Sequence, residues 1–325
     1  MSIDAAASPA ASLAPRLCFR LATRRDSSGI TALLNETFRT PIDVATWEWY
    51  AHANPNGPSR VYLALRDGGA IAGVIGFSPV GLRIGGSPVT ASYAHHLALN
   101  PEFRDTLSYI AFLRYSLKAE ASAGAKLTIG PPNRTAYPIH KTLMKWVDFG
   151  YLDCLRKLSP TARQHSCCEV RLFAPEFDLF YQSVSNGFAF CVDKGAAWMN
   201  WRFCSRPGSP YTVYTAGGAG GLTGYVVLKR WQEPDGRRKA HIMDLHAKNE
   251  SALHHLIATA EAYAAGCEEL NLWAIQGYPY RSFLEAAGFE VSRRQPLLAK
   301  SLDGDSVVFP AGNSSLSYGD GDCQY

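Results

Sequence analysis

The distribution of apolar and polar residues predicts regular structure from residue 17 onward. Strands are expected where the two kinds of residue alternate, and helices where apolar residues recur every three or four positions. In the first half of the chain the predicted strands are 17–22, 61–66, 70–80, 89–99, 126–130 and 151–158. The predicted helices there are 26–38, 43–53, 104–123 and 133–146. This order indicates an antiparallel meander between helices, followed by a strand–helix–strand unit.

The second half of the chain repeats the later part of that order. Strands are expected at 222–230, 240–246, 269–275 and 289–293, and helices at 252–265 and 280–287. Gly224 follows Gly73 by 151 positions, and Asn249 follows Asn100 by 149. Such a nearly constant offset indicates a repeated architecture. We therefore expect an α/β (α+β) protein of two like-folded halves, each a mixed, mostly antiparallel sheet flanked by helices.

Composition shifts suggest the domain boundaries. The two halves are expected at 17–158 and 196–302, joined by a linker and helix at 159–195. Residues 1–16 are rich in Ala, Ser and Pro and lack the basic and apolar stretches of a signal peptide, which predicts a disordered leader. Residues 303–325 are rich in Gly, Ser and Asp and are expected to be a flexible tail.

Charge and cysteine content narrow the class of protein. The net charge of +4 comes from 32 basic and 28 acidic residues that are interspersed, so no nucleic-acid partner is expected. The eight cysteines form no C-x-x-C pair, which predicts reduced thiols, no metal site and a cytoplasmic location. No apolar run approaches the ~20 residues that cross a bilayer. The even charge pattern is typical of a monomer or a weak dimer.

Three short motifs carry a resemblance to a known family. Leu97-Ala98-Leu99-Asn100-Pro101-Glu102-Phe103-Arg104 joins a predicted strand to a helix, and Asn133-Arg134-Thr135-Ala136 opens the last helix of the first half. Gly288-Phe289 ends the corresponding helix of the second half. In this order the motifs resemble the GNAT N-acyltransferase superfamily over residues 17–158 and 196–295. Tandem GNAT halves also occur in N-myristoyltransferases and in Fem-type aminoacyl ligases.

The resemblance implies acetyl-CoA as a co-substrate and no metal. In the family, backbone N–H groups of an Arg/Gln-x-x-Gly-x-Gly/Ala loop at a helix N-terminus bind the pyrophosphate. Here Arg104 matches, whereas Leu107 and Tyr109 stand where glycines are expected. The corresponding turn after Asp244-Leu245-His246 has neither Arg nor glycine, so the second half is expected to supply acceptor contacts. The predicted cofactor-binding residues are Leu97, Leu99, Arg104, Thr106, Leu107, Ser108, Tyr109 and Asn133.

Catalysis by such an enzyme needs a base for the incoming ammonium and an acid for the leaving thiolate. The family places a Tyr acid seven residues after the Asn that opens the last helix, and this position is His140. Tyr137, one helical turn earlier, is the alternative. His95, His96 and Tyr93 lie on the strand where the family keeps its base. Strand alternation predicts that the two histidines point to opposite faces, with Tyr93 on the face of His95.

These features predict an N-acetyltransferase. It would move an acetyl or other acyl group from coenzyme A to a primary amine of a small molecule, such as an amino sugar. Two alternatives stay open at this point. One is a Fem-like transferase that takes an aminoacyl group from tRNA, which predicts a basic groove and a coiled-coil arm. The other is a non-catalytic binding protein that kept the fold and lost the cofactor loop.

Overall fold

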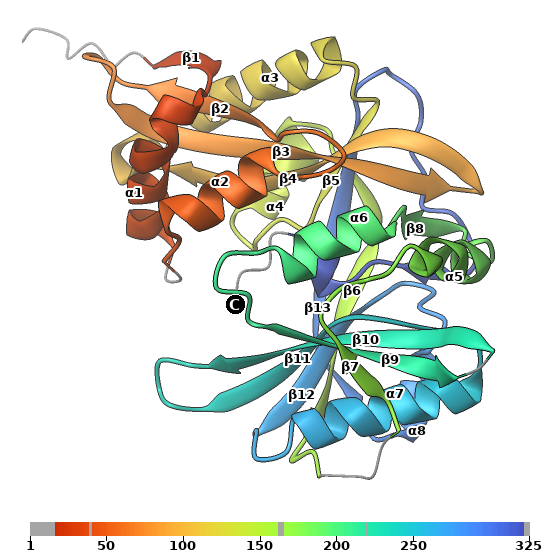
Figure 1. Ribbon diagram of the computed structural model, residues 1–325. Helices are drawn as coiled ribbons and strands as arrows, with labels where there is room; N and C mark the ends of the chain where they lie inside the picture. Colours follow the sequence, from red (N-terminus) through yellow and green to blue (C-terminus); the bar gives the residue numbers. More distant parts are fainter. Residues whose placement is uncertain (1–16, 39–40, 162–165, 219, 322–325) are drawn as a thin grey trace, which may run out of the picture.

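The computed structural model describes residues 17–38, 41–161, 166–218 and 220–321. The predicted leader, 1–16, lies outside these residues. Within them, the strands form one sheet of 14 strands, which is bent into two lobes (Figure 1). No helix in the described ranges is both long enough and apolar enough to cross a membrane.

The first lobe follows the predicted order of elements. Asp43 and Asp105 cap α2 and α3, because each carboxylate accepts backbone N–H groups of the first helical turn. The elements are β1 (Cys18–Leu21), η1 (Arg24–Asp26), α1 (Ser27–Thr37), α2 (Val44–His52), β2 (Arg60–Leu65), β3 (Ile71–Ile84), β4 (Ser87–Leu99), η2 (Pro101–Phe103), α3 (Thr106–Ser122), β5 (Leu127–Gly130), α4 (Ala136–Pro138), η3 (Ile139–Leu143) and β6 (Val147–Leu158).

The single helix predicted over 133–146 is wrong in detail. The structure has the short helix α4 followed by the π-helix η3, in which Met144 N–H donates to the Ile139 carbonyl. Pro138 has no N–H to give to a preceding carbonyl, so a regular α-helical ladder cannot continue through it. The wider turn that results carries His140.

The second lobe also follows the predicted order, and it adds β7, β8, β9 and β14, which the sequence pattern did not predict. Pairs of antiparallel strands again precede a helix, a strand, a helix and a strand. The elements are β7 (Cys168–Val170), α5 (Glu176–Ser185), β8 (Phe190–Val192), α6 (Ala196–Met199), η4 (Asn200–Cys204), β9 (Tyr211–Gly218), β10 (Gly221–Gln232), β11 (Arg238–Ala247), α7 (Glu250–Tyr263), β12 (Glu269–Ile275), α8 (Arg281–Ala286), β13 (Glu290–Ser301), β14 (Ser314–Ser315) and η5 (Tyr318–Asp320).

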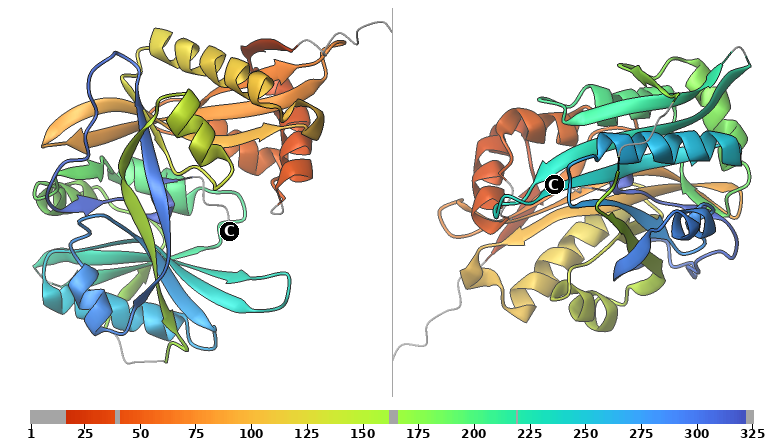
Figure 2. Two further views of the ribbon diagram at one scale, coloured as in Figure 1. Left: turned by 180° about the vertical axis from the view of Figure 1, so that it is seen from behind. Right: turned by 90° about the horizontal axis from the view of Figure 1, so that it is seen from below.

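The two lobes exchange strands at their junction. The order across the sheet is β1-β2-β3-β4-β5-β13-β6-β12-β11-β10-β9-β7. Strand β13 follows the second lobe in sequence but pairs with β5 of the first, and β6 follows the first lobe but pairs with β12 of the second. Because β6 and β13 also pair with each other, they run side by side between the lobes (Figure 2). Neither half therefore completes its sheet alone.

Both lobes contain a pair of parallel strands that separates after a short contact. In the first lobe, β4 and β5 pair only over Ala91–Tyr93 and Leu127–Ile129. In the second lobe, β11 and β12 pair only over Lys239–His241 and Glu269–Asn271. Helices α1 and α2 cover one face of the first-lobe sheet and α3 covers the other (Figures 1 and 2).

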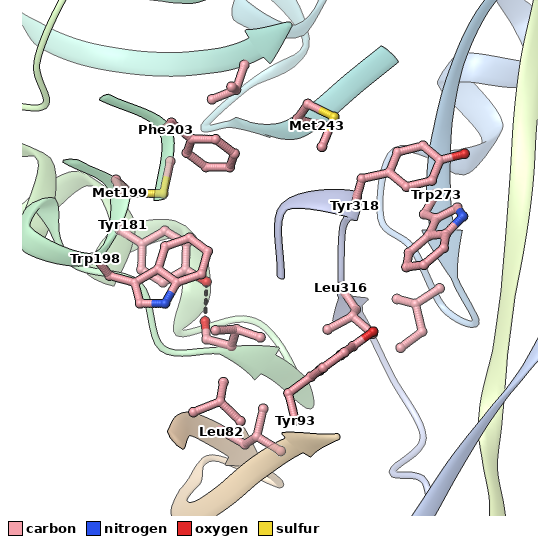
Figure 3. Packing of buried hydrophobic residues seen from close by; sticks show 14 of the residues in the cluster. Leu82, Tyr93, Tyr181, Trp198, Met199, Phe203, Met243, Trp273, Leu316 and Tyr318 are labelled. Atoms are coloured by element: carbon pink, nitrogen blue, oxygen red, sulfur yellow. Dashed lines mark hydrogen bonds between the residues drawn. The ribbon is translucent and has the colours of Figure 1, made fainter. Parts of the chain in front are cut away.

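Residues 314–321, hereafter the 314–321 segment, occupy the opening of the second lobe. Tyr318 packs against Trp273 of β12 with the two rings tilted and their centroids 4.6 Å apart, and Leu316 lies near Tyr93 of the first lobe (Figure 3). The buried ammonium of Lys194 lies 2.8 Å from a carboxylate oxygen of Asp244 in β11 and 2.9 Å from one of Asp320. The segment therefore belongs to the core that joins the lobes.

The prediction of a flexible tail over 303–325 is thus wrong for residues 314–321. Their Gly, Ser and Asp composition is typical of a loop, but the polar groups have partners. Ser317 and Asp320 cap each other in η5, and β14 pairs with β8. Residues 322–325 lie outside the described ranges.

Candidate functional site

A β-bulge in β4 decides where the two neighbouring histidines point. Val74 of β3 faces Ala98, and Gly76 faces His95, so Ile75 faces two residues of β4. His96 has a φ of 50°, in the left-handed region. The predicted alternation is therefore wrong here, and both imidazoles lie against Tyr50 of α2, with ring centroids 4.8 Å and 5.6 Å away.

The two histidines are in direct contact. Their Nδ1 atoms lie 2.7 Å apart, which is a hydrogen bond in which one ring donates and the other accepts. His95 is only 3% exposed, and burial together with the neighbouring imidazole holds its pKa well below the usual value. Its ring fits because residue 76 is glycine: a Cβ at Gly76 would lie 2.1 Å from Cε1 of His95.

The space between the separated ends of β4 and β5 is a cavity of about 790 Å³, hereafter the β4–β5 cavity. Beyond Tyr93, β4 has no pairing with β5, so its backbone faces this space. The cavity brings together His95, His96, Leu97, Leu99, Arg104, Tyr109, Asn133 and His140 from the predicted site. Its wall does not include Tyr93, Tyr137, Thr106, Leu107 or Ser108.

On the α3 side of the cavity, Tyr109 and His140 form a second hydrogen-bonded pair. Tyr109 Oη lies 2.7 Å from Nε2 of His140, and the imidazole packs edge-on against Trp146 at 4.8 Å. Burial lowers the pKa of His140 to about 4 and raises the pKa of Tyr109. At neutral pH, His140 is therefore a neutral imidazole and Tyr109 is a neutral phenol.

The two remaining predicted catalytic candidates point elsewhere. Tyr137 Oη donates to a carboxylate oxygen of Asp148 at 2.9 Å, outside the β4–β5 cavity. Tyr93 shares the face of His95 but reaches the core between the lobes, where a Cβ at Gly321 would lie 2.6 Å from its hydroxyl. Asn133 does open α4, because its side-chain oxygen accepts the N–H of Ala136 at 2.8 Å.

The start of α3 is already occupied by a carboxylate. Asp105 accepts the N–H groups of Leu107 and Ser108, both at 2.9 Å. Arg104 turns its Nε to the carbonyl of Leu99, 2.8 Å away, and the side chain of Leu107 is 80% exposed. A pyrophosphate needs these same N–H groups and is repelled by the carboxylate. The residues at this helix start therefore do not fit the phosphates of coenzyme A.

The β4–β5 cavity offers the backbone groups that an extended ligand such as a pantetheine arm would need. The exposed backbone edge of β4 can pair with the amides of an extended chain, as in β-strand addition. Two buried nitrogens of the wall, Nε2 of His95 and Nε1 of Trp146, have no hydrogen-bond partner among the described residues. Both atoms are also closed off from the cavity itself, so a ligand would reach them only after the side chains move.

Three residues of this site are not among those predicted from the sequence. Gly76 makes room for His95, Asp105 caps α3, and Trp146 packs on His140. Only Asp105 had a local signal, because Asp before an apolar helical run is a typical N-cap. The ranges of the chain that the structure describes hold no group of three His, Cys, Asp or Glu residues that could bind a metal ion.

The fold is that of GNAT N-acetyltransferases, as the sequence motifs predict. The chain is similar to the structure of a GCN5-related N-acetyltransferase from Anabaena variabilis, with a TM-score of 0.68 and 15% identity over 89% of this chain and 73% of the other. The structure of a probable N-acyltransferase from Enterococcus faecalis gives a TM-score of 0.67 and 12% identity, again over 89% of this chain and 73% of the other. A GCN5-related N-acetyltransferase from Kribbella flavida gives 0.63 and 12% over 89% and 72%. No protein-family model and no curated protein sequence matches the chain.

Proposed function

We propose that this protein is an N-acyltransferase that moves an acetyl or other acyl group from coenzyme A to a primary amine of a small molecule, such as an amino sugar. The β4–β5 cavity carries the proposal, because two histidines in contact form its β4 wall. The similarity in fold to N-acetyltransferases supports thioester chemistry at this place. Low identity means that the roles of individual residues rest on their geometry.

His96 is the proposed base. When Nδ1–H of His96 donates to Nδ1 of His95, Nε2 of His96 is the basic atom of the pair. A proton taken there from the acceptor ammonium is stabilised by the neutral His95, which burial keeps uncharged. His95 thus orients and supports His96. Backbone N–H groups of β4 beyond Tyr93 can polarise the acyl carbonyl, because they have no β5 partner.

Tyr109 is the proposed donor to the leaving sulfur, and His140 positions it. If the ring hydrogen of His140 lies on Nε2, Tyr109 Oη accepts it in a hydrogen bond. The phenol hydrogen of Tyr109 then points away from His140 and can point into the β4–β5 cavity, whose wall includes Tyr109. A neutral His140 cannot serve as a charged acid at pH 7, since its pKa is about 4. The direct acid role predicted for His140 is therefore reassigned to the phenol.

The test is a search for transfer. The purified protein is incubated with acetyl-CoA and a panel of primary amines that includes amino sugars. Release of free thiol and a mass increase of one acetyl group on one amine are expected. The matched control is His96→Ala, which should lose the transfer. Absence of thiol release with every amine and with longer acyl-CoA donors would remove the proposal.

A second candidate is a binding protein of the same fold. The Asp105 carboxylate at the start of α3 favours it, because it opposes phosphate binding there. Such a protein would bind an amine or a thioester without turnover, and His96→Ala would change affinity only. The Fem-like alternative predicts a coiled-coil arm, and the longest helix in the described ranges, α3 with 17 residues, is too short for one.

A further inference from the structure

A second hollow adjoins the β4–β5 cavity. It has a volume of about 1120 Å³ and shares Pro131, Pro132 and Asn133 with the cavity as a common wall. Arg134 from the loop after β5, and Arg293 and Arg294 from β13, line it together. We refer to it as the arginine hollow. The exchange of β13 into the first lobe is what brings these two parts of the chain to one place.

The arginine hollow carries an excess of positive charge. Asp148 is the single acidic residue of its lining, and it is already held by Lys141 and Tyr137. The carboxylate of Asp153 makes ion pairs with both Arg294 and Arg281. Its single negative charge therefore balances only one of these two guanidinium groups. Arg134 has no ion pair with any described residue and is exposed. An anion in the hollow would meet the guanidinium groups of Arg134 and Arg294, while the carboxylate of Asp148 is held by Lys141 and Tyr137.

One guanidinium is held in a fixed plane. Arg294 lies 3.9 Å from the ring centre of Tyr151 and makes its ion pair with Asp153 through Nε and Nη2. The Nη1 amine lies outside that pair. Prolines and Phe309 form an apolar part of the same hollow. Guanidinium groups next to flat apolar surfaces suit a ligand that combines phosphate with a planar ring, namely a phosphorylated nucleoside.

The start of α3 offers no competing place for such a group, because Asp105 occupies its N–H groups. We propose that the arginine hollow binds a phosphorylated nucleoside that is part of a substrate of the β4–β5 cavity. The inference rests on the proposed function. The nucleoside belongs either to coenzyme A or to the acceptor, and both present the same chemistry to Arg134, Arg293 and Arg294.

Calorimetric titration separates these sources. The full-length protein is titrated with coenzyme A, with dephospho-CoA and with adenosine 3′,5′-bisphosphate. The test variant is Arg134→Ala/Arg293→Ala. The matched control is Arg25→Ala/Arg114→Ala, which removes two exposed arginines outside both hollows. Thermal unfolding of all variants verifies that they are folded. A third variant, Asp105→Asn, removes the charge at α3 and keeps a residue that can cap the helix.

The bisphosphate should bind the wild-type protein. Its affinity should fall about tenfold or more in the test variant and stay unchanged in the control variant. If coenzyme A loses affinity to the same extent, and dephospho-CoA binds more weakly than coenzyme A, the donor is the source. If coenzyme A is insensitive and the bisphosphate is sensitive, the acceptor is the source. Asp105→Asn should leave all affinities within about threefold.

Two results would overturn the inference. In the first, coenzyme A binds and transfer occurs, but the test variant binds both coenzyme A and the bisphosphate like wild type, and Asp105→Asn binds both more tightly. The phosphates then lie at α3, and the proposed function stands without the arginine hollow. In the second, the bisphosphate does not bind at millimolar concentration. If the wild-type protein binds no coenzyme A and transfers no acyl group, the proposed function itself is removed.

Discussion

Nδ1 of His95 and Nδ1 of His96 lie 2.7 Å apart, although the residues are neighbours on a strand and would ordinarily face opposite sides of the sheet. The positive φ of His96 turns its side chain to the side of His95, and Gly76 leaves room for both rings. The pair borders the β4–β5 cavity and lies against α2. Its geometry, rather than either residue alone, supports the assignment of His96 as the base.

His96→Ala should lower kcat by about 10²–10⁴-fold with little change in donor affinity, because it removes the proton acceptor. Steady-state kinetics with the amine found by screening provides the measurement. His254→Ala, a change at an exposed histidine of α7, is the matched control and should behave as wild type. A kcat for His96→Ala within about threefold of wild type would pass the role of base to another group.

Gly76→Ala should displace the ring of His95. The new Cβ would lie 2.1 Å from Cε1 of His95, so the imidazole must move and the contact with His96 must break. We expect a loss of about 1–3 kcal/mol in the free energy of unfolding and a loss of activity. Gly81→Ala on the same strand is the control, because its nearest side-chain atom, Cβ of Asp193, is 3.4 Å away. Equal activities of the two variants would contradict the role given to His95.

Tyr109→Phe should lower kcat by about 10–100-fold if its hydroxyl serves the leaving sulfur. The matched control is Tyr137→Phe, which removes a hydroxyl that donates to Asp148 outside the cavity. That variant should keep kcat within about threefold of wild type. The opposite ranking of the two variants would restore Tyr137, the alternative indicated by the sequence, as the acid.

Acid should destabilise the protein through His140. Its pKa is lowered from 6.5 to about 4 by burial, so the unfolded chain binds the proton more readily than the folded chain. The contribution of neutral His140 to the free energy of unfolding is complete above pH 6.5 and is lost as the pH falls toward 4. The loss amounts to at most roughly 3 kcal/mol, at 1.36 kcal/mol per pKa unit. Urea unfolding at pH 7 and pH 4.5 should show a smaller pH dependence for His140→Gln than for wild type. Identical pH dependences would show that His140 titrates normally in the folded protein.

Lys194→Met should destabilise the protein by about 3–5 kcal/mol, since it leaves the buried carboxylates of Asp244 and Asp320 without their cation. The 314–321 segment should then become sensitive to proteolysis. Adding Asp320→Asn to Lys194→Met should recover part of the loss, because one buried charge is removed. If Lys194→Met unfolds at the same urea concentration as wild type, the ion cluster does not hold the segment in place.

Local signals in the sequence were sufficient for most of the elements and for part of the site. Helix α3 was expected at 104–123 and begins and ends within two residues of these limits, at Thr106–Ser122. Asn133 was expected to open the last helix of the first half, and it caps α4. The wall of the β4–β5 cavity includes His95, Arg104 and His140, because strand β4 and the turns after β4 and β5 carry them to one opening. His96 lies there too, although strand alternation predicts that at most one of the two histidines faces the cavity.

The sequence by itself determined the order of strands and helices, because hydrophobic periodicity and capping residues act over two to four positions. The tertiary structure alone decided the bulge at His96 and the burial of the 314–321 segment. It also decided the exchange of β6 and β13 between the lobes. These features depend on contacts between residues far apart in the chain, such as Lys194 with Asp320 and Gly130 with Leu298, whose burial and pairing no local pattern records.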